Sequence, residues 1–182
     1  MADVEAAAAA KEQASKGTTQ ADVDRAAATV TPGDVNSMSP EIIDMDIFGQ
    51  LLEMDDEDDR EFSKEIVWNY FDQAESTFSK MDQALSKKDL PELSTLGHFL
   101  KGSSAAVGVI KVRDSCEYMQ HYGKKADKDG ITELSAEAAL EKLTTTLEGV
   151  KIEYKEAEVA LRKFYEDDEG EDGENEAEED EE

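Results

Sequence analysis

The chain has 182 residues and a formal net charge of −27 at pH 7, because 46 acidic side chains outnumber 19 basic ones. This length fits a single domain, and the acidic balance argues against direct binding to nucleic-acid phosphates, which are held by Lys and Arg. Cys116 is the only cysteine, so no intramolecular disulfide is possible and a reducing compartment is expected. No apolar run approaches the ~20 residues that cross a bilayer, and the N-terminus lacks a secretory signal. We therefore expect an intracellular protein that does not bind membranes.

Residues 1–38 are predicted to form a disordered N-terminal segment. They are rich in Ala, Thr, Asp and Gly and carry almost no large apolar side chains. Such a segment cannot bury enough apolar surface to offset the entropy that it loses on ordering. The alanines from Ala6 to Ala10 allow transient helix, but a short isolated helix is marginal in water. Order is expected to begin near Pro40.

A short helix is predicted over residues 44–54, with Asp44 or Asp46 as its N-cap. It carries more apolar side chains than one packing seam requires, which hints at exposed apolar surface. These side chains are Ile47, Phe48, Leu51 and Leu52. The acidic run from Asp55 to Asp59 should form a turn that complements the positive N-terminal dipole of the next helix. Because the run lacks the spaced Gly and terminal Glu of an EF-hand loop, we predict no metal site there.

Four longer helices are predicted over residues 60–85, 89–107, 110–126 and 132–165, each with apolar residues at helical spacing. The stripe of the first consists of Phe62, Ile66, Tyr70, Ala74, Phe78, Met81 and Leu85. Asp89 should cap the second helix, which tolerates Pro91 in its first turn, and Gly108 should end it in a left-handed conformation. In the last helix, apolar residues alternate at spacings of four and three, as in the seam of a helical bundle.

No strand-like alternation occurs, so we predict an all-α domain over residues 39–166. Four long helices with short connections indicate an up-down-up-down four-helix bundle, with the short additional N-terminal helix across one end or flank. Residues 167–182 are mostly Asp and Glu. They should repel one another and remain a disordered acidic tail.

The second long helix carries an unusual exposed group of residues. Its buried side is marked by Leu93, Leu96, Leu100, Ser104 and Val107. His98 is two residues past Leu96, about 200° around the helix, so its imidazole should point to solvent. Lys101 and Gly102 lie one turn further on and flank the imidazole. A glycine inside a helix costs roughly 1 kcal/mol relative to alanine, and we interpret it as clearance for another protein that approaches His98.

These residues form the pattern His98-x-x-Lys101-Gly102-Ser103-Ser104-Ala105-x-x-Gly108. The pattern resembles the signature of histidine-containing phosphotransfer (HPt) domains, and Phe62-Ser63-Lys64 and Asp72-Gln73-Ala74 extend the resemblance to the fungal, yeast-type phosphorelay intermediates. The resemblance covers about residues 41–165. It implies that His98 accepts a phosphoryl group from the receiver domain of a hybrid histidine kinase and passes it to the receiver domains of response regulators. The fungal resemblance also implies movement between the cytoplasm and the nucleus, and we expect a monomer.

An imidazole nitrogen is a competent nucleophile toward phosphorus at neutral pH. Phosphoryl transfer asks mainly for positioning and charge neutralisation, and Lys101 supplies one positive charge. Gln120 and Lys124 occupy positions that carry a Gln and a basic residue in the family that the sequence resembles, so a hydrogen bond to His98 and a second cation are implied for them. The chain has no Walker-type loop and no kinase lysine–aspartate set. We therefore predict a phosphocarrier without kinase or phosphatase activity, whose partner supplies Mg²⁺ and the acceptor aspartate.

The docking surface is predicted from apolar residues that the core does not require. The candidates are Ile47, Leu51, Met54, Ile66 and Phe99. An apolar patch on a small acidic protein often marks an interaction site, although Ile47 and Leu51 could simply hold the first helix on the bundle. Two other functions stay open. The acidic tail would suit a histone or basic-protein chaperone, and a non-phosphorylated adaptor is the third possibility.

Overall fold

The computed structural model describes residues 17–166. Residues 1–16 and the predicted acidic tail, residues 167–182, lie outside the described part of the chain. Between residues 17 and 166 the regular secondary structure consists of the α-helices α2 to α7, one 3₁₀ turn (Val35–Ser37) and two isolated β-bridges. This architecture confirms the predicted all-α fold. None of the helices in this part is both long and apolar enough to cross a membrane.

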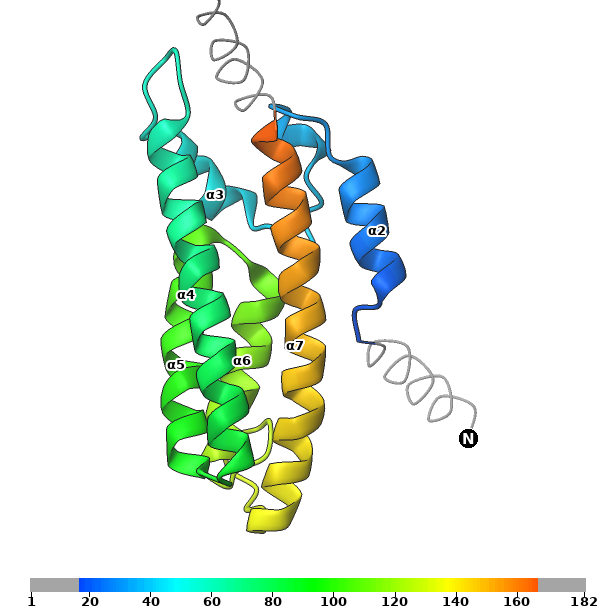
Figure 1. Cartoon of the computed structure of the whole chain (residues 1–182), viewed down its shortest axis with the longest axis vertical. Coiled ribbons are helices and arrows are strands. Elements are labelled where there is room, and N and C mark those ends of the chain that lie inside the picture. The colour runs from blue at the N-terminus through cyan, green and yellow to red at the C-terminus, as the bar shows by residue number, and fades with distance from the viewer. Residues whose placement is uncertain (1–16, 167–182) are drawn as a thin grey trace, which may run out of the picture.

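The bundle consists of α4 (Glu61–Ser86), α5 (Leu90–Val107), α6 (Ile110–Gly123) and α7 (Ala136–Phe164). Figure 1 shows these helices running alternately down and up, as predicted, with α4 and α7 longer than the pair α5 and α6. The side chains that face inward along all four helices form one apolar core. Tyr70 and Ser104 lie within it, and their hydroxyl groups satisfy each other at 2.9 Å.

The short helix α3 (Met45–Leu52) covers the end of the shorter α5–α6 pair (Figure 1). Asp44 caps it, accepting hydrogen bonds from the amides of Asp46 and Ile47. The amide of Asp44 in turn donates to the carbonyl of Gly108 at 2.8 Å. Gly108 has φ +87°, and a Cβ there would lie 2.9 Å from the carbonyl oxygen of Asp44. Only glycine satisfies both conditions, so this residue fixes α3 to the α5–α6 turn.

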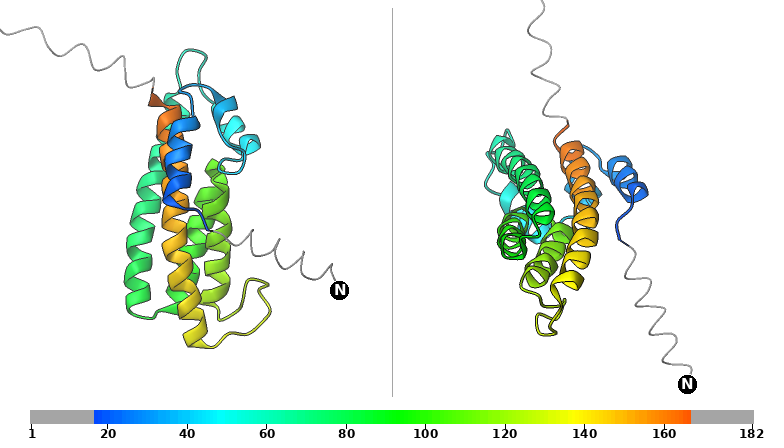
Figure 2. Two further views of the ribbon diagram at one scale, coloured as in Figure 1. Left: turned by 90° about the vertical axis from the view of Figure 1, so that its right-hand side faces the viewer. Right: turned by 60° about the horizontal axis from the view of Figure 1, so that its bottom comes forward.

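The prediction that residues 1–38 are disordered is wrong for residues 17–38. Residues Gln20–Thr29 form helix α2, and Figures 1 and 2 show it running alongside α7. Its N-terminus has a capping box between Thr19 and Asp22. Residues 17–38 have four buried apolar side chains, those of Val23, Ala26, Val30 and Met38. A few small apolar side chains at helical spacing are therefore enough to stabilise α2, because α7 offers a surface on which they pack.

The acidic run from Asp55 to Asp59 precedes α4, as predicted, and one of its carboxylates caps that helix. Asp55 accepts from the amide of Ser63 at 2.7 Å and from its hydroxyl at 2.6 Å. The hydroxyl of Tyr165 donates to the same Ser63 oxygen at 2.7 Å. This buried network joins the loop, α4 and the end of α7, so it holds the top of the bundle together.

Candidate functional site

His98 lies on the solvent side of α5, as its spacing predicts, and its side chain is exposed. Asp89 caps the helix by accepting from the amide of Glu92 at 3.2 Å, with Pro91 in the first turn. Hydrogen bonds to α4 fix the rotation of α5, because Ser103 donates to Gln73 at 3.2 Å and Ser104 pairs with Tyr70. The imidazole of His98 makes no hydrogen bond within residues 17–166, so it is available to an incoming group.

Two glycines bring α5 and α6 into close contact. A Cβ on Gly97 would lie 3.0 Å from the carbonyl oxygen of Cys116 and 3.2 Å from the amide nitrogen of Gln120. A Cβ on Gly123 would lie 2.7 Å from the carbonyl oxygen of Leu90. Backbone therefore packs on backbone at both crossing points, and α6 is held beside the residue that precedes His98.

Lys101 and Gly102 flank His98 in different ways. The ammonium of Lys101 lies 3.4 Å from a carboxylate oxygen of Glu117 on α6, and its side chain is 34% exposed. The sequence analysis did not predict Glu117 as a partner of Lys101. A search for acidic residues on the helix that follows the His98 helix could have found it. Gly102 is exposed, and a Cβ there would meet nothing within 4 Å. The space that was predicted above this glycine is therefore present.

Gln120 and Lys124 lie on α6 and at its C-cap, the first half-exposed and the second exposed. The backbone carbonyl of Gln120 accepts from the hydroxyl of Ser94 at 3.0 Å, which adds to the α5–α6 contact. Among the hydrogen bonds of residues 17–166 there is none between Gln120 and His98. Their roles toward His98 stay predictions. His121 packs against Gly130 at the end of the bundle, as expected for a histidine outside the site.

The predicted docking residues divide into three groups. Met54 is 63% exposed and Phe99 is 50% exposed. Ile47 and Ile66 are half-buried. Leu51 is only 8% exposed and belongs to the core, so its prediction as a docking residue is wrong. The reason is that α3 turns Leu51 inward beside Phe48, and both hold the helix on the bundle.

Phe62 was predicted to belong to the core stripe of α4, but it is 42% exposed. Ser63 takes the buried position, because its hydroxyl is satisfied by Asp55 and Tyr165. Phe62 lies one turn before Ile66, and the Asp55–Ser63 contact brings the segment after Met54 to the start of α4. Phe62 is therefore a further exposed apolar candidate for the docking surface. The sequence indicated it through its spacing of four residues from Ile66, which places both side chains on one side of α4.

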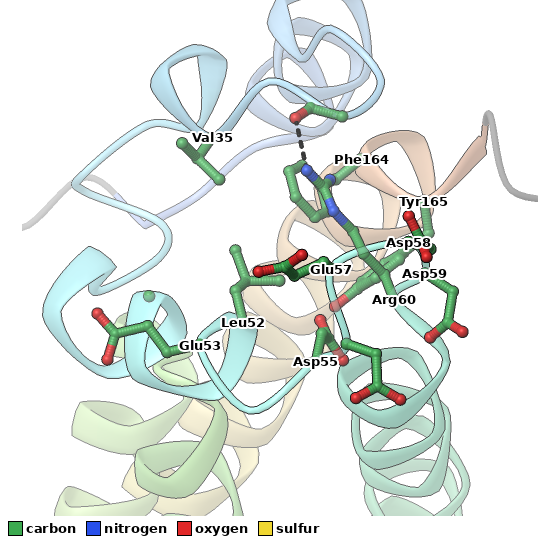
Figure 3. Close-up of a pocket in the computed structure, with 13 residues that line it drawn as sticks. Val35, Leu52, Glu53, Asp55, Glu57, Asp58, Asp59, Arg60, Phe164 and Tyr165 are labelled. Carbon is green, nitrogen blue, oxygen red and sulfur yellow. Dashed lines mark hydrogen bonds between the residues drawn. The ribbon is translucent and has the colours of Figure 1, made fainter.

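A pocket of about 630 Å³ lies at the top of the bundle, between α3, the acidic run and the end of α7 (Figure 3). Arg60 crosses it, donating to the carbonyl of Gly33 at 3.2 Å, with its guanidinium 4.7 Å from the Phe164 ring. None of the residues that line it belongs to α5, so it is separate from His98. No group of three or more His, Cys, Asp or Glu within residues 17–166 could hold a metal ion.

Several ionisable groups are buried away from His98. Burial raises the pKa of the Cys116 thiol and of the Tyr70 hydroxyl well above their usual range. Glu153 on α7 accepts from the hydroxyl of Ser115 at 2.6 Å. Its burial, helped by the nearby Glu156 carboxylate, raises its pKa to about 7 despite that hydrogen bond and Lys111. Tyr70 and Cys116 belong to the core, and Glu153 lies on α7, whereas His98 lies on the exposed side of α5.

Comparison with known proteins places this arrangement in a family. The Hpt domain family matches residues 65–152. The structure also matches the Saccharomyces cerevisiae histidine phosphotransfer signalling protein Ypd1, solved with the receiver domain of its downstream response regulator Ssk1. The TM-score is 0.62 at 34% identity, over 70% of this chain and 97% of that chain. The chain belongs to the Hpt domain family.

Two curated relatives support the assignment of this HPt domain protein. It is 52% identical over 127 residues to multistep phosphorelay regulator 1 of Schizosaccharomyces pombe, covering 69% of this chain and 43% of that protein. It is 43% identical over 94 residues to the phosphorelay intermediate protein YPD1 of Saccharomyces cerevisiae, covering 51% of this chain and 56% of that protein. The chain thus spans about half the length of the curated relatives that it matches.

Proposed function

We propose that this HPt domain protein is a phosphorelay intermediate. His98 accepts a phosphoryl group from the receiver-domain aspartate of a hybrid histidine kinase and passes it to the receiver aspartates of downstream response regulators. The observation that carries the proposal is the exposed, unpaired imidazole of His98 beside the open space at Gly102. The presence of a receiver domain in the Ypd1 co-crystal supports receiver domains as the partners.

The chemistry requires one unprotonated nitrogen of His98. That nitrogen attacks the phosphorus of the aspartyl phosphate, an N–P bond forms, and the P–O bond to the aspartate breaks, releasing a carboxylate. The second transfer reverses these roles, because a carboxylate oxygen of the next receiver attacks the phosphohistidine and the imidazole nitrogen leaves. Both steps have a loose, in-line transition state, so they depend on positioning and on neutralising charge.

The neighbours of His98 take the supporting roles. Lys101 exchanges its exposed ion pair with Glu117 for the oxygens of the phosphoryl group, which is favourable because such a pair is weak in water. Gly102 lets the receiver approach. Gln120 and Lys124, on the helix that packs behind Gly97, supply a hydrogen bond and a second cation. Met54, Phe62, Ile66 and Phe99 present apolar surface to the receiver, with Ile47 at the edge.

The protein acts as a carrier without kinase or phosphatase activity of its own. The receiver domain supplies Mg²⁺ and the acceptor aspartate, as the resemblance to HPt domains implies. In that role the protein works as a monomer, inside the cell, in the cytoplasm and the nucleus.

A phosphotransfer assay tests the site. The full chain is incubated with a phosphorylated receiver domain, and the modified residue is located by mass spectrometry under conditions that preserve phosphohistidine. His98→Gln should abolish acceptance and leave the far-UV circular dichroism unchanged, because His98 packs against no core residue. His121→Gln is the matched control and should transfer normally. If His98→Gln still accepted phosphate and His121→Gln did not, the proposed function of His98 would be excluded.

A further inference from the structure

A groove opens between α2, α4 and the last turns of α7, away from His98. Its volume is about 360 Å³, and it is lined by Ala27, Trp68, Val159, Arg162, Lys163 and Glu166. Helix α2, which forms one wall through Ala27, lies beside α7 in Figures 1 and 2. The floor includes the half-buried ring of Trp68, which packs edge-on against Tyr165 at 5.6 Å between ring centroids.

The groove concentrates positive charge in a protein that is acidic overall. The guanidinium of Arg162 lies 5.2 Å from the Trp68 ring centroid, and the ammonium of Lys64 lies 5.4 Å from it. The Nε of Arg162 donates to Glu158 at 3.0 Å. Among the hydrogen bonds of residues 17–166 this is the one that Arg162 makes, and a guanidinium has five N–H donors. Its side chain is 47% exposed, so the remaining donors can reach a further acceptor.

The buried carboxylate near this groove is already neutralised. Glu158 is 4% exposed, and it accepts from Lys155 at 2.9 Å as well as from Arg162. Lys163 pairs with Glu166. The three cations Lys155, Arg162 and Lys163 therefore outnumber the two carboxylates of Glu158 and Glu166. An anionic segment placed in the groove would gain favourable interactions.

The chain itself supplies such a segment at the edge of the groove. Glu166 lines the groove, and the sequence continues with Asp167, Asp168 and Glu169. These three carboxylates begin three residues after Phe164, the last residue of α7, near a helix end whose dipole disfavours negative charge. Since they are tethered beside Arg162 and Lys163, their effective concentration at the groove is high, and the neighbouring cations offset the unfavourable dipole.

We propose that the first residues of the acidic tail, Asp167, Asp168 and Glu169, bind in this groove of the same molecule and cover Trp68. The interaction is between charges near the surface, so salt should weaken it. It positions the start of the tail along α2 and α7, on helices that do not carry His98.

The single tryptophan of the chain gives a direct measurement, the quenching of Trp68 fluorescence by acrylamide. At low salt the quenching constant of the full chain should be low. It should roughly double when the ionic strength rises from about 0.01 M to about 1 M, because the Debye length falls from about 30 Å to about 3 Å. The triple variant Asp167→Asn/Asp168→Asn/Glu169→Gln should show the higher quenching constant at both salt concentrations.

The matched control is Glu178→Gln/Glu179→Gln/Asp180→Asn, which removes three charges further along the tail and should behave as the unmodified chain. Equal quenching in all three proteins at low salt would overturn the proposal. Zero-length carbodiimide cross-linking shows whether the tail in the groove comes from the same chain or from a second copy. Cross-links from the tail to Lys64 or Lys155 within one chain support the proposal. Cross-links found only between isotopically labelled and unlabelled chains would show that a second copy fills the groove, and would refute binding within one molecule.

Discussion

Two glycines of α5, Gly97 and Gly102, have opposite surroundings, and their substitution should separate packing from partner access. Gly102→Gln places a side chain where a Cβ meets nothing within 4 Å. It also removes a glycine from a helix interior, so stability should rise by several tenths of a kcal/mol. Phosphoryl transfer should nevertheless slow in both directions by about a hundredfold, because displacement of ~1 Å at the reacting atoms has that effect. Transfer rate and receiver affinity are measured on the same samples.

The control for this prediction is Gly97→Ala, five residues earlier. Its Cβ would lie 3.0 Å from the carbonyl oxygen of Cys116, so the α5–α6 contact must open and the free energy of unfolding should fall by about 1–3 kcal/mol. Urea denaturation of both variants checks the contrast. Normal transfer and normal receiver binding by Gly102→Gln would refute the idea that this glycine provides clearance.

Lys101→Ala should affect transfer in a different way from Gly102→Gln. It removes a charge next to His98 without adding bulk, and the lost pair with Glu117 is half-exposed and worth little to stability. Receiver affinity should stay within about threefold, whereas the transfer rate should fall, because less charge is neutralised at the phosphoryl oxygens. Single-turnover transfer measured beside equilibrium binding distinguishes the two effects. Equal losses of affinity and rate would assign Lys101 to docking.

Glu153 should make the fold less stable as the pH rises. Its pKa is about 7 in the folded protein against 4.5 for an ordinary glutamate, so the folded state binds the proton more tightly than the unfolded state. Stability is then lost between about pH 4.5 and pH 7, by an amount on the order of 3 kcal/mol. Glu153→Gln should remove this slope and be more stable than the unmodified chain at pH 8. Urea denaturation at pH 5 and pH 8 measures the free energy of unfolding of Glu153→Gln, of the unmodified chain and of the control Glu148→Gln, whose side chain is exposed. If Glu153→Gln showed the same pH dependence as the other two proteins, the inference would be wrong.

At the scale of elements, the bundle helices could be predicted from the sequence within a few residues, because long apolar stripes and caps define them. Asp89 and Gly108 end α5 as expected. The phase of the α4 stripe was predicted less well. Ser63 is buried in place of Phe62 because Asp55 and Tyr165, which are distant in sequence, satisfy its hydroxyl. The spacing of apolar residues along α4 cannot predict such hydrogen-bond partners.

Helix α2 could not be predicted from its apolar content, since its stability depends on the surface of α7. The capping box of Thr19 and Asp22 was the local signal that a helix begins there. At the His98 site, exposure and the neighbouring glycine follow from helical spacing alone. The Glu117 partner of Lys101 does not, because it depends on how closely α6 approaches at Gly97 and Gly123.

The dependence of α2 on α7 can be tested with a pair of alanines. Ala26 is buried and Ala28 is exposed. Ala26→Asp places an unpaired charge between α2 and α7, so α2 should detach, since an isolated helix of this length is marginal. Hydrogen exchange of the α2 amides should lose its protection while the bundle amides keep theirs. Ala28→Asp adds the same charge on the solvent side and should leave protection unchanged. Loss of bundle protection in Ala26→Asp would show that α2 and the bundle unfold as one unit.

At the scale of the whole molecule, the acidic tail follows a different helix from the one that carries His98. His98 lies on α5, whereas residues 167–182 follow the end of α7, and the acidic run Asp55–Asp59 lies at the same end of the bundle as Phe164 and Tyr165. A polyanion of this kind attracts cationic proteins at long range. The alternative function, a chaperone for histones or other basic proteins, would use that end of the molecule.

Deleting residues 167–182 decides between the two functions. The segment contributes no apolar residue larger than alanine, so the melting temperature should change by no more than about 2 °C. Phosphoryl transfer to and from receivers should stay within about twofold, because the reacting face lies on α5 and the tail follows α7. Binding to a basic protein such as a histone, measured at low salt, should fall by more than tenfold if the tail attracts it electrostatically. His98→Gln in the full chain is the complementary variant and should keep any such binding while it loses transfer. If the truncated chain lost receiver binding instead, the tail would be a recognition element for the phosphorelay partners.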